Sequence, residues 1–122
     1  MATVYEEVGG QEYFDRLVAA FYRAVDQDPV LRPLYPDDLG GPERHLAWFL
    51  GQYWGGPRTY SDERGHPRLR MRHAPFVIGL NERNAWLRHM VDAVKTSGVS
   101  AEIEAQMIEY FEMSSRTLIN SV

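Results

Sequence analysis

Apolar residues recur every three or four positions along most of this chain, and this spacing limits the folds that it can adopt. In the first such segment they are Phe14, Leu17, Val18, Phe21, Tyr22 and Val25. A period of this kind places the side chains on one face of a helix. Similar faces run over residues 46–53, 86–94 and 103–118. No stretch alternates as a strand would, so the sequence predicts an all-α domain of four amphipathic helices.

Glycine and proline mark the ends of the first two helices. The pair Gly9-Gly10 is expected to form a flexible segment before the first helix, and prolines at positions 29, 33 and 36 make the chain turn repeatedly after it. The second helix is predicted to begin near Pro42 or Glu43, because the missing N–H of proline has no helical partner in a first turn. Gly55-Gly56-Pro57 should end it.

The helical pattern fails between Pro57 and Pro75, in a stretch rich in proline and charged residues. An irregular segment of this length inside a compact domain is uncommon, and it usually serves a function or is held by a ligand. Beyond it, Asn81 is predicted to cap the third helix and Ser100 the fourth, with a turn at Gly98 between them. The sequence therefore predicts one long irregular loop between the second and third helices.

Composition and charge exclude several classes of protein. The 122 residues are expected to form one domain, 1–122, and 44% hydrophobic with 25% charged residues is typical of a globular chain. A net charge of −4 argues against a general nucleic-acid binder. Without cysteine, the chain has no disulfide, iron–sulfur cluster, thiolate haem ligand or Cys-containing zinc site. Since residues 1–10 lack a signal-peptide apolar region and no apolar run approaches the about 20 residues of a membrane span, a cytoplasmic protein is expected.

Three of the four histidines have an ordinary structural interpretation. His89 is interpreted as a solvated helix position, His45 as a partly exposed helix residue and His66 as the cap of a loop. A zinc site built from histidines alone would need a spacing such as His-x-x-x-His, which the chain does not have. The chain also lacks the Gly-x-Ser-x-Gly motif of a serine nucleophile and a glycine motif that would hold phosphate.

His73 has a more distinctive setting. It follows Arg70, Met71 and Arg72, and it stands two residues before Pro75, which interrupts helical geometry. Neutral imidazole is a strong ligand for iron, and the two neighbouring cations would suit the carboxylates of a haem. The alternative is a basic loop with an incidental histidine, and the residues alone leave both interpretations open.

Three polar aromatic residues are expected to face inward. Tyr22 lies on the apolar face of the first helix, Trp86 on that of the third, and Tyr35 in the turn after the first helix. Each could be ordinary core packing. Because a buried phenol O–H or indole N–H needs a partner, however, three such donors also indicate a site that accepts hydrogen bonds.

Two segments of the chain resemble a known family. Residues 52–61, read as Gln-Tyr-Trp-Gly-Gly-Pro-Arg-Thr-Tyr-Ser, and residues 65–76, read as Gly-His-Pro-Arg-Leu-Arg-Met-Arg-His-Ala-Pro-Phe, closely resemble the group II truncated haemoglobins, particularly the actinobacterial oxygen-binding type. Gly9-Gly10 and Gly55-Gly56 match the two glycine motifs of that family. The resemblance implies a shortened globin, a two-over-two sandwich of four main helices around haem b, with irregular chain in place of much of the proximal helix.

The resemblance also implies a role for individual residues. His73 matches the proximal iron ligand, while Tyr22, Tyr35 and Trp86 match distal residues that face the bound gas. The residues that match the wall of the haem pocket are Phe21, Leu46, Phe49, Leu50 and Phe76. Those that match positions near the haem propionates are Arg72, Tyr60 and His66. The chain between Tyr35 and Leu46 is about one residue shorter than the family pattern, which places Pro42 at the distal gate and brings His45 nearer to the haem.

The function that the resemblance implies is the binding of O2 and other small diatomic ligands. Three distal donors would stabilise the partial negative charge on bound O2 and slow its release. The alternatives are a peroxidase or a nitric-oxide-detoxifying oxidoreductase that uses the same haem, and a helical interaction protein without a cofactor. A reductase partner and a homodimer are further possibilities, whereas nucleic acid and a membrane span are not expected.

Overall fold

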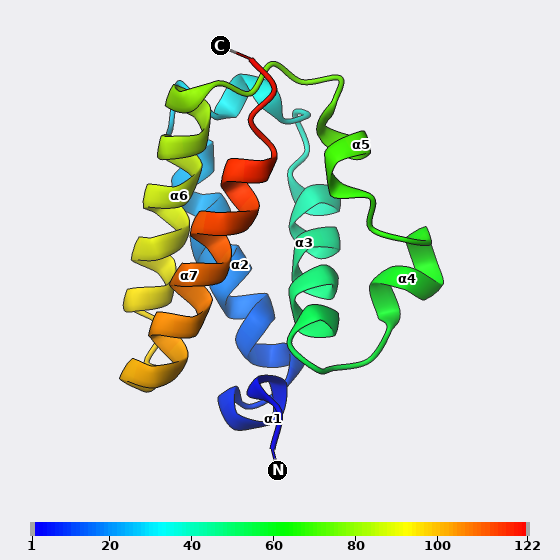
Figure 1. Cartoon of the computed structure of the whole chain (residues 1–122), viewed down its shortest axis with the longest axis vertical. Helices are drawn as coiled ribbons and strands as arrows, with labels where there is room; N and C mark the ends of the chain where they lie inside the picture. The colour runs from blue at the N-terminus through cyan, green and yellow to red at the C-terminus, as the bar shows by residue number, and fades with distance from the viewer. Residues whose placement is uncertain (1, 122) are drawn as a thin grey trace.

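The computed structural model describes residues 2–121, and it is helical throughout, with no strand in that part of the chain (Figure 1). Four long helices are present, as the apolar period predicted: α2 (Gln11–Asp26), α3 (Gly40–Tyr53), α6 (Leu80–Lys95) and α7 (Ala101–Thr117). The shorter elements are α1 (Val4–Val8), the 3-10 turn η1 (Arg32–Leu34), α4 (Thr59–Arg64) and α5 (Leu69–His73). The all-α prediction is therefore confirmed. No helix within residues 2–121 has the length and apolar character needed to cross a membrane.

The long helices form two pairs. α2 packs against α3, α6 packs against α7, and contacts between α2 and α6 join the pairs. In Figure 1, α6 and α7 lie on one side of the molecule, while α4 and α5 lie on the other, beyond α3.

The apolar face of α2 supplies the centre of the core. Phe14 and Phe21 are fully buried there, as are Met90 of α6 and Phe111 of α7. The Phe21 ring lies edge-on to Trp86, with 5.2 Å between ring centroids. Full burial of each such side chain stabilises the fold by roughly 1.5–3 kcal/mol, so this shared core fixes how α2, α6 and α7 are placed.

Two helix starts differ from the sequence prediction. α3 begins at Gly40, slightly earlier than the predicted start near Pro42 or Glu43, and Pro42 lies within its first turn, where proline is tolerated. Asn81 does not cap α6, because the helix begins one residue earlier, at Leu80. Gly79 is the N-cap, and its N–H donates to the carboxylate of Glu82 over 2.7 Å. The prediction for Ser100 is confirmed, since its hydroxyl accepts a hydrogen bond of 3.2 Å from the N–H of Ile103.

The segment 57–75 is not fully irregular, which corrects the prediction of one long loop. It contains the short helices α4 and α5, of six and five residues, which are too short to show an apolar period. The chain before α2 is also more ordered than expected. Thr3 and Glu6 form a capping box on α1, and Gly9 and Gly10 have φ angles of 102° and 83°. These left-handed conformations make the glycine pair a defined turn rather than a flexible segment.

Candidate functional site

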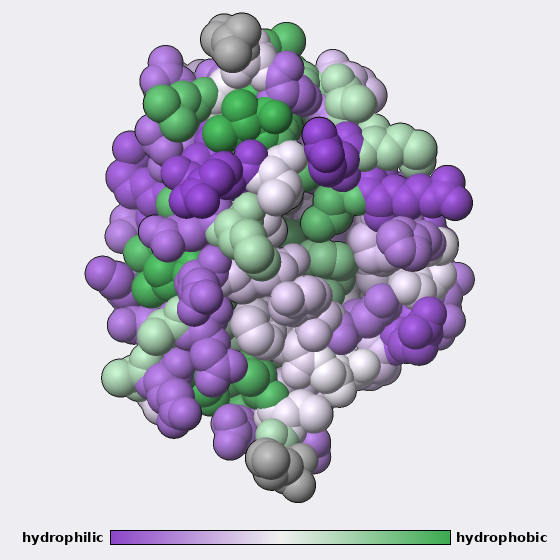
Figure 2. All heavy atoms as spheres, in the orientation of Figure 1, coloured by the Kyte–Doolittle hydropathy of each residue, from purple (hydrophilic) through white to green (hydrophobic). Residues whose placement is uncertain are grey.

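A cavity of about 360 Å³ opens between the two helix pairs. Its apolar wall includes Leu46, Phe49 and Leu50 of α3, and Tyr110 and Phe111 of α7. Figure 2 shows hydrophobic side chains at the bottom of a hollow on this face, with hydrophilic residues around it. The volume lies within the range of roughly 300–1,000 Å³ that is usual for ligand and cofactor sites.

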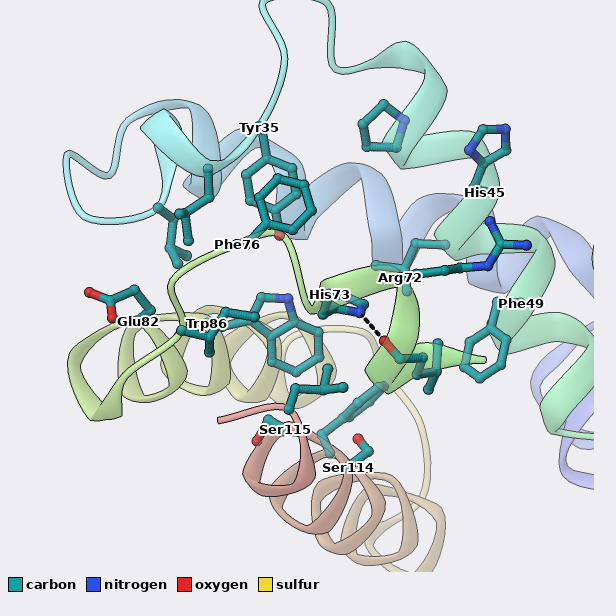
Figure 3. A pocket seen from close by; sticks show the side chains of 18 of the residues that line it. Tyr35, His45, Phe49, Arg72, His73, Phe76, Glu82, Trp86, Ser114 and Ser115 are labelled. Carbon is teal, nitrogen blue, oxygen red and sulfur yellow. Dashed lines mark hydrogen bonds between the residues drawn. The ribbon is translucent and has the colours of Figure 1, made fainter. Parts of the chain in front are cut away.

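His73 is the last residue of α5, and its side chain lines the cavity. In Figure 3 the imidazole lies between the Trp86 indole and the Arg72 side chain. The Nδ1 atom lies 2.6 Å from the carbonyl oxygen of Leu69, so the N–H is on Nδ1 and donates to this carbonyl. The lone pair is then on Nε2, which is the arrangement of a histidine prepared to bind a metal.

A metal held by His73 would need most of its other ligands from elsewhere. Within residues 2–121 no group of three or more His, Cys, Asp or Glu side chains lies close enough to hold a metal ion. One imidazole beside an apolar cavity instead fits a metal that an organic macrocycle carries, as in haem. The residues present therefore fit the cofactor that the sequence indicated.

The cavity receives three polar aromatic side chains from three different elements. Tyr22 lies on α2, Tyr35 directly follows η1, and Trp86 lies on α6. The rings of Tyr22 and Tyr35 meet edge to face, with centroids 5.5 Å apart. Burial raises the pKa of Tyr35 to about 12, although hydrogen bonds from Tyr22 and Trp86 act to lower it. Burial and the bond to Tyr35 also raise the pKa of Tyr22, so both phenols stay protonated near neutral pH.

The indole N–H of Trp86 can only donate a hydrogen bond, whereas each phenol hydroxyl can donate or accept one. All three side chains line the cavity, so together they bring three hydrogen-bond donors to it.

Cationic side chains lie at the edge of the cavity. Arg72 donates from Nε to the carbonyl of Pro67 and from a terminal nitrogen to that of Arg64, each over 2.8 Å. Its guanidinium lies 5.8 Å from the centre of the Tyr60 ring. Arg64 in turn lies 3.4 Å from Nε2 of His45. Arg72, Arg64, His45 and Tyr60 all line the cavity, and together they form a positive rim suited to carboxylates.

The structure brings most of the sequence-predicted site residues to one cavity. Those that line it are Tyr22, Tyr35, Leu46, Phe49, Leu50, Tyr60, Arg72, His73, Phe76 and Trp86. Phe21 does not line it, because its ring is buried in the core against Trp86. His66 is exposed and also lies outside the cavity, and its Nδ1 accepts the Arg68 N–H over 3.2 Å as the cap of a loop. Pro42 and His45, both in the first part of α3, also line the cavity.

Other lining residues were not predicted as part of a site. They include Leu31, Arg64, Arg83, Tyr110, Phe111 and Leu118. The helical period had placed Tyr110, Phe111 and Leu118 on an inner face, but it could not separate core contacts from cavity contacts. The interpretation of His89 as a solvated residue is wrong, because its Nε2 lies 2.6 Å from the buried carboxylate of Asp28. These partners are far apart in sequence, so no local signal could have paired them.

Comparisons with known proteins agree with this geometry. The sequence profile of the bacterial-like globin family matches residues 3–120. The group 2 truncated haemoglobin YjbI of Bacillus subtilis is 40% identical over 116 residues, which cover 95% of this chain and 87% of that protein. A thermostable haemoglobin from Thermobifida fusca is 53% identical, with a TM-score of 0.95 and 98% of each chain covered. The haemoglobin of Chloroflexus aurantiacus is 50% identical, with a TM-score of 0.96 and coverage of 98% and 99%.

The resemblance to the group II truncated haemoglobins is thus confirmed in sequence and in fold, and the match extends over nearly the whole chain. The two-over-two arrangement of the four long helices is that of the solved relatives. This protein belongs to the bacterial-like globin family, and its cofactor is haem b.

Proposed function

We propose that this protein binds O2 and other small diatomic ligands at its haem and releases O2 slowly. The observation that supports this proposal is the convergence of Tyr22, Tyr35 and Trp86 on the cavity that His73 also lines. Bound haem supplies an iron atom that accepts one protein ligand and leaves a coordination position for a small gas. The side chains of this protein would hold the cofactor, exclude water and stabilise the bound gas.

His73 would hold the cofactor through Nε2, while the carbonyl of Leu69 keeps the imidazole in one orientation. Leu46, Phe49 and Phe76 would cover its faces and exclude water. Arg72 and Tyr60 would lie near its carboxylates, with Arg64 and His45 as further partners that the structure adds to the sequence prediction. This division places the charged groups at the rim and the apolar groups inside.

The distal donors would determine how long O2 stays. O2 gains partial negative charge on binding, so a donor aimed at it forms a charge-assisted hydrogen bond. One bond of this kind contributes roughly 1.5–3 kcal/mol, which slows release by about ten- to a hundredfold if the whole effect is on dissociation. Tyr35 is the leading donor, because it lines the cavity together with Tyr22 and Trp86, and its ring meets that of Tyr22 with centroids 5.5 Å apart. Slow release favours scavenging or sensing of O2 over simple transport.

Spectroscopy and rapid kinetics test this proposal. The purified protein should show the absorption bands of haem b, and the reduced form should bind O2 and CO reversibly. Stopped-flow displacement of O2 by CO should give slow O2 dissociation that Tyr35→Phe accelerates by about tenfold or more. A protein whose O2 release is fast and insensitive to Tyr35→Phe would contradict the distal role proposed here.

A further inference from the structure

A buried carboxylate and a histidine join α6 to the chain segment that leads to Tyr35. Nε2 of His89 lies 2.6 Å from Oδ2 of Asp28, and the two side chains are 17% and 6% exposed. His89 lies in α6, whereas Asp28 lies just beyond the end of α2. The contact therefore ties the third long helix to the turn that follows the first.

The other carboxylate oxygen of Asp28 organises that turn. Oδ1 accepts the backbone N–H of Val30 over 2.8 Å, in the manner of an Asx-turn. The backbone carbonyl of Asp28 accepts the N–H of Arg32 over 2.8 Å, which starts η1. The N–H of Tyr35 then donates to the carbonyl of Arg32 over 3.2 Å. A continuous series of hydrogen bonds thus runs from His89 to the backbone of Tyr35.

The side chain of Arg32 holds the backbone that follows Tyr35. One terminal nitrogen donates to the carbonyl of Pro36 over 2.9 Å, and the other donates to that of Asp37 over 2.8 Å. Its Nε pairs with Asp26 over 3.1 Å. Hydrogen bonds therefore hold the backbone both before and after Tyr35. The His89–Asp28 pair connects this segment to α6.

The same two segments meet a second time at the distal site. Trp86 and His89 are three residues apart on α6, so they lie on neighbouring positions of one helix face. Trp86 lines the cavity together with Tyr35, while His89 donates to Asp28. We propose that His89 and Asp28 are positioning residues for O2 binding, which set the placement of the Tyr35 hydroxyl relative to Trp86.

A purely stabilising role explains the pair less well. Burying two charged groups costs desolvation that largely offsets their attraction, so a buried ion pair adds little net stability compared with apolar packing. The pair instead fixes the distance between α6 and the turn after α2, and therefore the placement of Tyr35 relative to Trp86. That is valuable where a donor must meet a small ligand, because a small misplacement weakens a directional hydrogen bond.

The test compares O2 and CO release in variants of the haem-loaded protein. His89→Leu should raise the O2 dissociation rate by about three- to tenfold, since Tyr35 keeps its hydroxyl but loses its alignment. The CO dissociation rate should change by less than about twofold, because CO carries little charge for a donor to stabilise. His89→Gln keeps an N–H donor toward Asp28 and should stay near the wild type. Arg88→Gln is the matched control, since Arg88 is 62% exposed and only reaches the same carboxylate over 3.5 Å.

A second measurement does not depend on gas binding. Hydrogen exchange of the backbone amide of Tyr35 should be faster in His89→Leu than in His89→Gln or Arg88→Gln, because the series of hydrogen bonds is broken at its start. If His89→Leu does not fold, Asp28→Asn replaces it, since the amide keeps the shape of the side chain but loses one acceptor oxygen.

Because this inference rests on the proposed function, Trp86→Phe is measured in parallel. If Trp86→Phe and Tyr35→Phe both leave O2 release unchanged, the distal network itself is wrong. If those variants accelerate release but His89→Leu and Asp28→Asn do not, the positioning role is wrong. An equal rise in O2 and CO release in His89→Leu would also overturn it, since that result indicates general loosening of the cavity.

Discussion

The imidazole of His73 and the carbonyl of Leu69 stand one helical turn apart in α5, with 2.6 Å between Nδ1 and the oxygen. This bond fixes both the tautomer and the orientation of the ring. It lies within a helix of five residues, in a segment that showed no apolar period. The short helix places a backbone acceptor beside the imidazole, and the opposite nitrogen faces the cavity.

The first prediction concerns this ligand. His73→Ala should weaken haem retention strongly, because imidazole ligation contributes directly to holding the cofactor. Haem transfer to an excess of an apoglobin acceptor, followed by absorbance, measures the loss. His66→Ala is the control histidine, since His66 is exposed and does not line the cavity. Unchanged ferrous spectra and haem affinity in His73→Ala would show that the ligand is another residue.

The second prediction concerns the distal indole. Trp86→Phe keeps an aromatic ring against Phe21 but removes an N–H donor from the cavity. Folding and haem content should be nearly unchanged, whereas O2 dissociation should rise by about tenfold or more. The double variant with Tyr35→Phe should show less than the sum of the two effects, because both residues belong to one network. If Trp86→Phe releases O2 at the wild-type rate, Trp86 contributes only to core packing.

The third prediction concerns the positive rim. Arg72→Ala should speed haem loss only modestly, since a solvent-accessible pair with a carboxylate is worth at most about 1 kcal/mol. O2 release should stay close to the wild-type rate, because Arg72 does not belong to the distal network. His66→Ala provides the comparison and should change neither quantity, as His66 lies outside the cavity. A large effect of Arg72→Ala on O2 affinity with normal haem retention would contradict this assignment.

The fourth prediction concerns pH and His45. Burial lowers the pKa of His45 from its usual 6.5, and the charges of Arg64, Arg44 and Arg72 act in the same direction. As the pH falls below about 6.5, the unfolded chain therefore takes up a proton at this residue before the folded protein does, and stability declines. The Tm of the haem-free protein should fall more between about pH 7.5 and pH 5.5 than the Tm of His45→Gln does. An equal fall in both proteins would exclude this titration.

Much of the candidate site could be predicted from the sequence because local signals carried it. The setting of His73 between cations and a proline, and the polar aromatics at inward positions, made His73, Tyr35 and Trp86 candidates, and the resemblance to a family gave them roles. The predictions that the structure corrects are those that depend on contacts between residues far apart in sequence. Phe21 and Trp86 both lie on apolar helix faces, yet Phe21 is buried behind Trp86 and only Trp86 reaches the cavity.

The sequence by itself determined the helical class and the four long helices, because periodicity and helix breakers are local properties of the chain. It offered His73 as an iron ligand only together with the resemblance to a family. Tertiary structure alone decided which inner-facing residues line the cavity and which fill the core. It also decided that His89 pairs with Asp28 and that Arg64 reaches His45. These contacts join residues far apart in sequence, and they form only when the packing of α2, α3, α6 and α7 brings their elements within hydrogen-bond distance.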